Sequence, residues 1–304
     1  MENKKGVLKK SVICGIIVCL ILLTGWLLKG DGLTKHAIEL TQLKNNIHRQ
    51  MMGYIIKTEN DKVIVIDGGT TEDAQNLERN IMELGGKVDG WFLTHVHDDH
   101  VGAFTQIVAN TEIEINHIYV SLNEKQWYQT YEPERAEFSN QFIELLEREE
   151  LKEKVKQVKL NEKIKIDGIK VEVLGVKNPE ITENAGNEQS MVVKFQLGET
   201  SLLILGDTGE KSSEKLLMTQ REKLKSDIVQ VSHHGQAGAT KELYEQIRPT
   251  TCLWPTPDYL WNNDNGTGEN TGTWKTFETR GWMEELEVKE HLIEKDGDIT
   301  IQLK

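Results

Sequence analysis

The chain has 304 residues and a formal net charge of −13, because 49 aspartates and glutamates outnumber 36 lysines and arginines. A hydrophobic content of 38%, a charged content of 28% and only five prolines exclude a disordered, collagen-like or polytopic membrane protein, and they predict a globular body with a real core. The acidic balance disfavours a protein that coats DNA, since it repels polyanions at long range. Three cysteines, two of them in the apolar N-terminal stretch, exclude a disulfide scaffold and a cysteine-rich zinc site.

The N-terminal segment has the pattern of a membrane anchor. Residues 1–10 hold four lysines and one glutamate, a net charge of +3, which leaves −16 for the rest of the chain. Residues 11–28 carry no charge, and a helix of that length is about 27 Å long, close to the hydrocarbon thickness of a bilayer. We expect a signal anchor with a cytoplasmic N-terminus and everything after it outside the cytoplasm. A cleaved signal peptide, giving a secreted protein, is the alternative, and a buried core helix is a third.

The rest of the chain predicts a polar tether over residues 29–50 and one domain over residues 51–304. In chain order, the first expected elements are two strands within 52–69, a helix over 71–84, a strand over 88–94, a short helix from about Gly102, a strand over 115–121 and a helix over 133–149. A hairpin with an Asp-Gly turn follows at 164–175. The last expected elements are strands at 191–197, 201–207, 227–232, 250–254, 286–293 and 298–304, with helices near 214–224, before 250 and near 274–282.

This order of elements favours the α+β class. Strands outnumber helices, and hairpins lie at both ends of the domain. Such a pattern suits two sheets packed face to face with helices outside better than a singly wound parallel sheet.

One short motif carries most of the chemical information. Residues 95–100 read H-x-H-x-D-H and follow an apolar strand directly. Residues two apart point the same way in an extended loop, so His95 and His97 can offer nitrogens to one metal ion. Asp99 and His100 lie where the chain turns into a helix and can address a second ion. Two ions also need a shared anionic ligand and a closing ligand, and two later strands end at Asp207 and at the pair His233 and His234.

These motifs, in this order, resemble those of the metallo-β-lactamase-fold hydrolases. The closer likeness is to the extracellular hydrolase domain of ComEC/Rec2-type competence proteins and its stand-alone relatives, which show a similar Asn-x-x-Ser, here residues 187–190, and a similar His-His-Gly, here residues 233–235. The resemblance implies an αββα sandwich with a dinuclear site at one edge, usually of zinc and sometimes of manganese or iron. With the anchor, the expected architecture is one transmembrane helix followed by this sandwich.

The resemblance also implies a role for each motif residue. His95 and His97 would bind the first metal and Asp99 and His100 the second, with Asp207 bridging the two and His233 completing the second site. His234 would contact substrate or donate a proton, Asp99 would orient a metal-bound hydroxide, Asp67 would support the metal loop from behind, and Asn187 and Ser190 would bind substrate. Asp98 would face solvent.

One departure from the family pattern concerns the first metal. Many members have a further histidine between the H-x-H-x-D-H box and the bridging aspartate, and the only candidate here is His117, inside a strand-like stretch where a structural role is favoured. The first metal would then have three protein ligands, with water or Asn187 at the remaining position, or the first site would be only weakly occupied. The nitrogen and oxygen donor set suits Zn²⁺ or Mn²⁺.

The predicted function is metal-dependent hydrolysis, and the substrate is open. The resemblance favours a phosphodiester, with DNA among the candidates, although the acidic charge disfavours long-range attraction of DNA. A net charge of +4 over residues 152–177 is interpreted as a solvated lysine face. A phosphorylcholine esterase, or another hydrolase of small esters or lactams, is the alternative, because four tryptophans could cage a quaternary ammonium: Trp254, Trp261, Trp274 and Trp282. A membrane-anchored binding protein with a vestigial metal site is the alternative of a different class.

Overall fold

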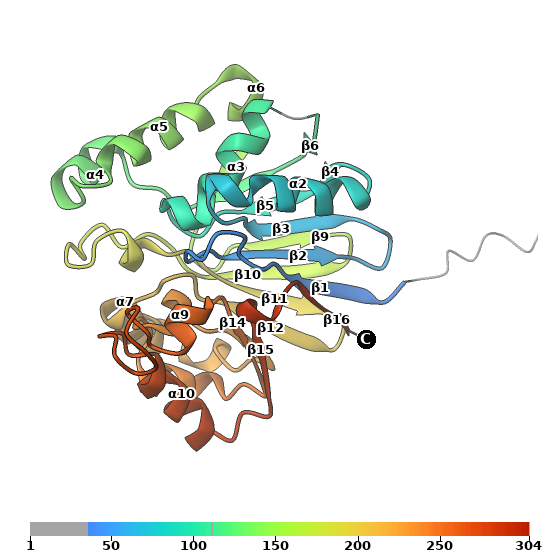
Figure 1. Ribbon diagram of the computed structural model, residues 1–304. Coiled ribbons are helices and arrows are strands. Elements are labelled where there is room, and N and C mark those ends of the chain that lie inside the picture. The colour runs from blue at the N-terminus through green and yellow to red at the C-terminus, as the bar shows by residue number, and fades with distance from the viewer. Residues whose placement is uncertain (1–35, 111, 304) are drawn as a thin grey trace, which may run out of the picture. The chain divides into compact units, whose positions relative to one another are not determined.

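In the computed structural model of the protein, residues 36–110 and 112–303 are described (Figure 1). The predicted membrane anchor over residues 11–28 and the first part of the predicted tether lie outside the described residues. Among the residues that are described, no helix combines the length and the apolar character needed to cross a bilayer.

Two seven-stranded sheets form the centre of the domain. The first sheet runs, in spatial order, β16 (Ile299–Leu303), β1 (Ile38–Gln42), β2 (Gly53–Lys57), β3 (Val63–Asp67), β5 (Gly90–Phe92), β7 (Ile118–Val120) and β8 (Val155–Gln157). The second runs β15 (Glu290–Ile293), β14 (Thr251–Trp254), β13 (Ile228–Gln230), β12 (Thr200–Ile204), β11 (Val192–Leu197), β10 (Ile169–Gly175) and β9 (Lys163–Ile166). A small separate sheet pairs β4 (Lys87–Val88) with β6 (Glu114–Ile115).

Helices cover the outer face of each sheet (Figure 1). Those of the first half are α2 (Ala74–Glu83), α3 (Asp98–Asn110), α4 (Lys125–Tyr131), α5 (Ala136–Leu146) and α6 (Glu149–Lys152). Those of the second half are α7 (Glu210–Thr219), α8 (Lys241–Ile247), α9 (Asp258–Trp261) and α10 (Thr276–Glu285). The second half also has short 3₁₀ turns, among them η2 (Asn187–Gln189) and η4 (His233–Gly235).

The sequence of the central strands explains the four layers. All five residues of β3 are buried. Val63 and Val65 belong to the apolar cluster under the helices, whereas Ile64 and Ile66 belong to the cluster between the two sheets. Alternate residues of a strand point to opposite faces, so a continuous apolar run is what a strand buried on both faces requires. The predicted αββα sandwich is confirmed.

Two boundaries differ from the prediction. The tether predicted over residues 29–50 is wrong in its later part, because β1 pairs with both β2 and β16 inside the first sheet. Its alternation of buried and half-buried residues is short, and polar flanks conceal it in the sequence. The helix expected from about Gly102 begins at Asp98, so Asp99 and His100 lie in its first turn. The predicted hairpin turn is confirmed, with Asp167 and Gly168 at φ values of 45° and 88° between β9 and β10.

The topology brings four chain segments to one edge of the sandwich. Strand β3 pairs in parallel with β5, and β12 pairs in parallel with β13. Parallel neighbours present their carboxyl ends at the same edge, so Asp67 and His95 lie close together, as do Asp207 and His233. The candidate metal centre is built at that edge.

Candidate metal centre

The first group of donor atoms comes from His95, His97 and Asp207. Their candidate ligand atoms all lie within 4.8 Å of one another, and all three residues are buried. The His95 Nε2 atom is 3.9 Å from Asp207 Oδ2. This is the set predicted for the first metal.

The second group comes from Asp99, His100 and His234. His234 Nε2 lies 3.2 Å from Asp99 Oδ2 and 3.6 Å from Asp207 Oδ2, and His100 Nε2 lies 3.2 Å from Asp207 Oδ1. Asp207 therefore stands between the two groups, one carboxylate facing both.

His234, and not the predicted His233, occupies the closing position. Strand β13 ends at Gln230, and His233 and His234 then both adopt left-handed backbone conformations, at φ values of 50° and 53°. This turn aims His234 inward, where its Nδ1–H donates to the Pro255 carbonyl at 2.8 Å. The prediction assumed that the first histidine after the strand points into the site, and the turn shifts that position by one residue.

His233 still borders the centre. Its Nε2 atom is 3.8 Å from Asp207 Oδ2 and 3.4 Å from the Asn187 amide nitrogen, and its side chain is 21% exposed. A cleft of about 650 Å³ opens beside it. The role of contacting a substrate, predicted for His234, therefore suits His233 better.

Buried donor atoms without hydrogen-bond partners indicate that the site fits divalent cations. The atoms His95 Nε2, His100 Nε2, His234 Nε2 and Asp207 Oδ1 are buried and have no hydrogen-bond partner among the described residues. Buried polar atoms without partners cost free energy, and such atoms are rare in folded proteins. Here they face one another, and imidazole nitrogens with carboxylate oxygens are ligands that Zn²⁺ and Mn²⁺ accept.

Asp67 supports the site from behind, as predicted. It accepts hydrogen bonds from the backbone N–H and the hydroxyl of Thr94, both at 2.7 Å, and from His100 Nδ1 at 2.7 Å. A proton fixed on Nδ1 leaves the lone pair of His100 on Nε2, which faces Asp207. Burial raises the pKa of Asp67, and the neighbouring His100 opposes that rise.

Ser190 does not have the predicted position of a substrate-binding residue. It is buried, and its hydroxyl accepts the backbone N–H of Asp207 at 3.0 Å. Gln230, which the sequence did not single out, accepts the backbone N–H groups of Leu205 and Gly206, both at 2.8 Å. Both side chains hold the turn that carries Asp207.

The charges of the site reinforce one another. Burial alone would raise the pKa of Asp207, but His100, His234 and His233 hold it well below its usual range. Burial alone would lower the pKa of His100, but Asp207 and Asp67 raise it well above its usual value. For His95, burial dominates and holds the pKa well below its usual value, so this imidazole keeps a free lone pair at neutral pH.

Two residues considered in the sequence lie outside the donor groups, and one neighbour of the site was not predicted. His117 is exposed, stacks on Tyr119 and lies outside both donor groups. Asp98 points away from the donors and pairs with Arg49 at 2.7 Å and with Arg135 at 3.0 Å. Sequence reasoning missed Glu132, whose Oε1 atom is 2.6 Å from His97 Nε2.

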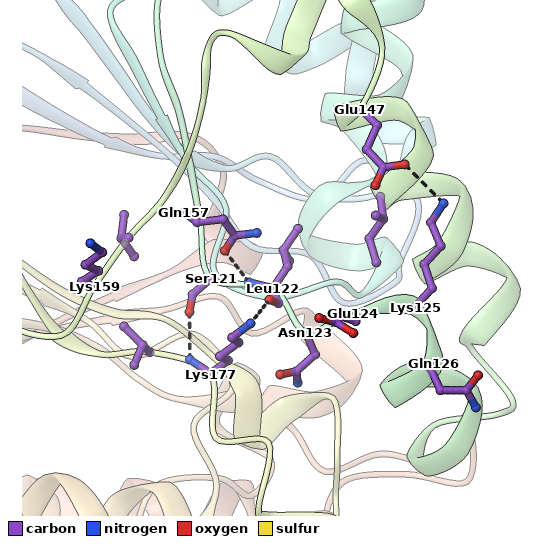
Figure 2. Close-up of a pocket in the computed structure, with 13 residues that line it drawn as sticks. Ser121, Leu122, Asn123, Glu124, Lys125, Gln126, Glu147, Gln157, Lys159 and Lys177 are labelled. Carbon is purple, nitrogen blue, oxygen red and sulfur yellow. Dashed lines mark hydrogen bonds and ion pairs between the residues drawn. The ribbon is translucent and has the colours of Figure 1, made fainter.

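A second cleft, of about 830 Å³, lies apart from these donors (Figure 2). It is bounded by the segment after β7, by Gln157 at the end of β8 and by helices α4 and α5, and Lys125, Lys159 and Lys177 line it. Lys125 pairs with Glu144 and Glu147, and Lys177 donates to the Leu122 carbonyl. None of the donor residues lines this cleft, so the metal centre is elsewhere.

Comparison with known proteins agrees with this geometry. Residues 52–251 match the sequence model of the metallo-beta-lactamase superfamily. ComE operon protein 3 of Bacillus subtilis (strain 168) is 28% identical over an alignment of 218 positions, which covers 63% of this chain and 25% of that protein. This chain thus spans about a quarter of the length of that relative.

Solved structures show the same fold. The metallo-beta-lactamase fold protein YhfI from Bacillus subtilis has a TM-score of 0.53 at 12% sequence identity, with 88% of this chain and 100% of that chain covered. Unliganded yeast PDE1 gives a TM-score of 0.53 at 12% identity, with the same coverage. The family match, the αββα sandwich and the two donor groups together show that this chain belongs to the metallo-beta-lactamase superfamily and is a hydrolase of that fold.

Proposed function

We propose that this hydrolase is a dinuclear metal-dependent phosphodiesterase. The observation that carries the proposal is the convergence of unpartnered donor atoms from two groups on the single carboxylate of Asp207. Divalent cations held there would lower the pKa of a water molecule and stabilise the negative charge that develops at the attacked centre. Zn²⁺ and Mn²⁺ both suit the donors.

The protein's own residues then have separate tasks. Burial alone would raise the pKa of Asp99, but the nearby His234, with its Nε2 atom 3.2 Å from Asp99 Oδ2, and the charge of His100 lower it. Asp99 is therefore a carboxylate at neutral pH and would accept a hydrogen bond from the attacking water. Burial lowers the pKa of His233, which leaves a neutral imidazole at the wall of the cleft. This imidazole is suited to contact a phosphoryl oxygen, with Asn187 beside it.

The preference for a phosphodiester rests on likeness to known proteins. The motifs resemble those of competence-protein hydrolase domains, and the 28% identity with ComE operon protein 3 supports the same group of relatives. Three lysines line the cleft beside His233: Lys211, Lys241 and Lys275. Each has a glutamate partner within 4.0 Å. We therefore expect the cations, rather than the lysines, to attract the phosphate.

The tryptophans give little support to the choline alternative. Trp254 is fully buried, and the guanidinium of Arg280 already lies over the ring of Trp261, 4.2 Å from its centroid. Tyr259 packs edge-on against Trp274. Of the four tryptophans, Trp282 alone lines the cleft beside His233. A cage for a quaternary ammonium needs several free aromatic faces, and these rings do not offer them.

A substrate panel tests the proposal. The full-length protein in detergent, loaded with Zn²⁺ or Mn²⁺, is assayed with bis(p-nitrophenyl) phosphate, p-nitrophenylphosphocholine and a chromogenic cephalosporin. We expect the simple diester to be cleaved fastest and chelation to abolish the reaction. Faster cleavage of the choline ester or of the lactam would contradict the substrate class. No cleavage of any of them by metal-loaded protein would favour the binding-protein alternative.

We also propose that residues 11–28 anchor the domain outside the cytoplasm. The uncharged stretch and the basic residues before it support this orientation. A C-terminal alkaline phosphatase fusion should be active and a C-terminal green fluorescent protein fusion dark. The opposite pair of results would sink the proposed topology.

A further inference from the structure

The four histidines of the two donor groups share one feature. Each uses one ring nitrogen for a hydrogen bond outside the centre. His95 Nδ1 is 3.2 Å from the Thr94 hydroxyl, His100 Nδ1 is 2.7 Å from Asp67, and His234 Nδ1 is 2.8 Å from the Pro255 carbonyl. His97 differs, since its outer partner, Glu132, lies on Nε2. An outer acceptor fixes which nitrogen carries the proton and which keeps the lone pair.

The segment that carries Glu132 is held against the site from several directions. Glu132 follows helix α4, and its carboxylate side chain is only 13% exposed. Three residues further on, Arg135 donates to Asp98 at 3.0 Å. The other end of α4 is tied down too, because Trp127 Nε1 donates to the Pro179 carbonyl at 2.9 Å. The carboxylate is therefore a fixed neighbour of His97 and not a loose surface group.

The opposite wall of this contact is Gly186, which precedes η2. A Cβ atom there would overlap both Glu132 Oε1 and His97 Nε2. Its φ of −61° and ψ of −47° are open to any residue, so backbone strain does not call for glycine. What the position requires is the absence of a side chain, which leaves room for the His97–Glu132 hydrogen bond.

Glu132 also has a buried oxygen atom that lowers the stability of the fold. Its Oε2 atom is buried and has no hydrogen-bond partner among the described residues. A buried carboxylate oxygen without a partner is unfavourable for folding. A task at the metal centre accounts for its presence.

We propose that Glu132 is the positioning residue of the first metal site. Its carboxylate accepts the Nε2–H of His97, holds the ring in place and leaves Nδ1 as the nitrogen that binds the cation. This inference rests on the dinuclear site proposed above. It also explains how a site without a further family histidine keeps its metal, because the hydrogen bond fixes the His97 ring with its Nδ1 lone pair toward the cation.

Metal binding tests the proposal without any substrate. The full-length protein in detergent is titrated with Co²⁺ and with Zn²⁺, and the two binding steps are followed by visible absorption and by competition with a chelator. We expect Glu132→Ala to weaken the first site by about 10- to 100-fold and to leave the second site unchanged. Glu132→Gln should fall between wild type and Glu132→Ala, because the amide oxygen still accepts the hydrogen bond without the charge.

Two further variants keep the test sharp. Gly186→Ala retains the carboxylate but crowds the hydrogen bond, so it should weaken the first site in the same direction. Glu134→Gln is the matched control, since Glu134 is exposed two residues away and should leave both sites unchanged. Thermal unfolding of the metal-free variants checks that each one folds. If Glu132→Ala does not fold, Glu132→Gln and Gly186→Ala still test the proposal.

Wild-type affinity at the first site in both Glu132→Ala and Gly186→Ala would overturn the proposal. A loss in Glu132→Gln as large as that in Glu132→Ala would also overturn it, because it would make Glu132 a direct ligand. Failure of the dinuclear site itself gives a different result, namely fewer than two cations in the wild-type protein. If the substrate proves not to be a phosphodiester, the results of these metal titrations are unaffected, because they use no substrate.

Discussion

At the scale of single residues, the centre depends on side chains that arrange the donors. Asp67 fixes the proton of His100, and Ser190 and Gln230 hold the turn before Asp207. Glu132 has the corresponding contact with His97. His97, His100 and Asp207 are thus each oriented by partners that themselves would touch no cation.

Asp67→Asn tests this arrangement at the second site. The amide still accepts from the Thr94 backbone, but it loses the charge that pairs with His100. We expect affinity for the second cation to fall by about 10- to 100-fold, and hydrolysis to fall with it. Zinc competition titration measures the change, with the exposed Asp61→Asn on the β2–β3 turn as control. Wild-type affinity for the second cation in Asp67→Asn would show that Asp67 does not orient His100 for metal binding.

The pH dependence of the metal-free protein follows from the raised pKa values. Asp207 and the other carboxylates raise the pKa of His100 and His234, and burial raises that of Glu294. Above the ordinary histidine pKa of about 6.5, the folded protein therefore holds protons that the unfolded chain has released. The stabilisation from His100 and His234 is complete below that pH and is lost as the pH rises through their raised pKa values.

The expected result is a melting temperature that falls in chelator between about pH 6.5 and 8.5. Cations require neutral imidazoles, so the rise in melting temperature on adding Zn²⁺ should grow over the same interval. Differential scanning calorimetry with and without the metal measures both trends. A metal-free melting temperature that increases over this interval would be incompatible with the charges described here.

At the scale of elements, the sequence predicted the central strands and the donors at most of their ends, but it chose the wrong histidine after β13 and missed the partner of His97. Apolar runs such as β3 and β12 are distinctive, because alternate residues must fill two different cores. The choice between His233 and His234 could not be made from spacing, since it depends on two left-handed residues in a row. Glu132 had no signal at all: it meets His97 across 35 positions of sequence, through the placement of α4.

The turn at η4 gives a prediction that separates the two histidines. His234→Ala removes a buried metal ligand, so the second cation should be lost almost completely. This loss exceeds the fall in affinity of about 10- to 100-fold expected when only the hydrogen-bond partner of a ligand is removed. His233→Ala should keep both cations and lower the rate of hydrolysis. Metal content by mass spectrometry and steady-state kinetics on the same preparations measure the difference. Loss of the second cation in His233→Ala, with both cations kept in His234→Ala, would show that His233 is the ligand.

At the scale of the whole molecule, the apolar layer between the sheets sets the distance between the two halves of the site. Phe195 of β11 is fully buried there and packs edge-on against Phe92 of β5, with ring centroids 5.2 Å apart. The donors after β5 and after β12 therefore keep their separation only while this layer is filled. The net charge of −13, by contrast, gives no long-range attraction for anions, so we propose that the cations capture the phosphate.

Phe195→Ala tests the layer. We expect a loss of about 3–5 kcal/mol in the free energy of unfolding, together with weaker binding of both cations because the two halves shift. Met218→Ala, at a side chain that is 80% exposed, should change stability by less than about 0.5 kcal/mol. Denaturant unfolding and metal titration measure both variants. A destabilised Phe195→Ala protein with unchanged metal affinity would show that the layer does not control the site.

The most direct test of the account is the number of cations bound by wild type and by Asp207→Asn. Inductively coupled plasma mass spectrometry of dialysed, full-length protein counts them, and the diester assay is run on the same samples. We predict two cations per wild-type chain, at most one in Asp207→Asn, and loss of diester hydrolysis in the variant. Two tightly bound cations in Asp207→Asn, or full activity without them, would contradict a centre built on one shared carboxylate.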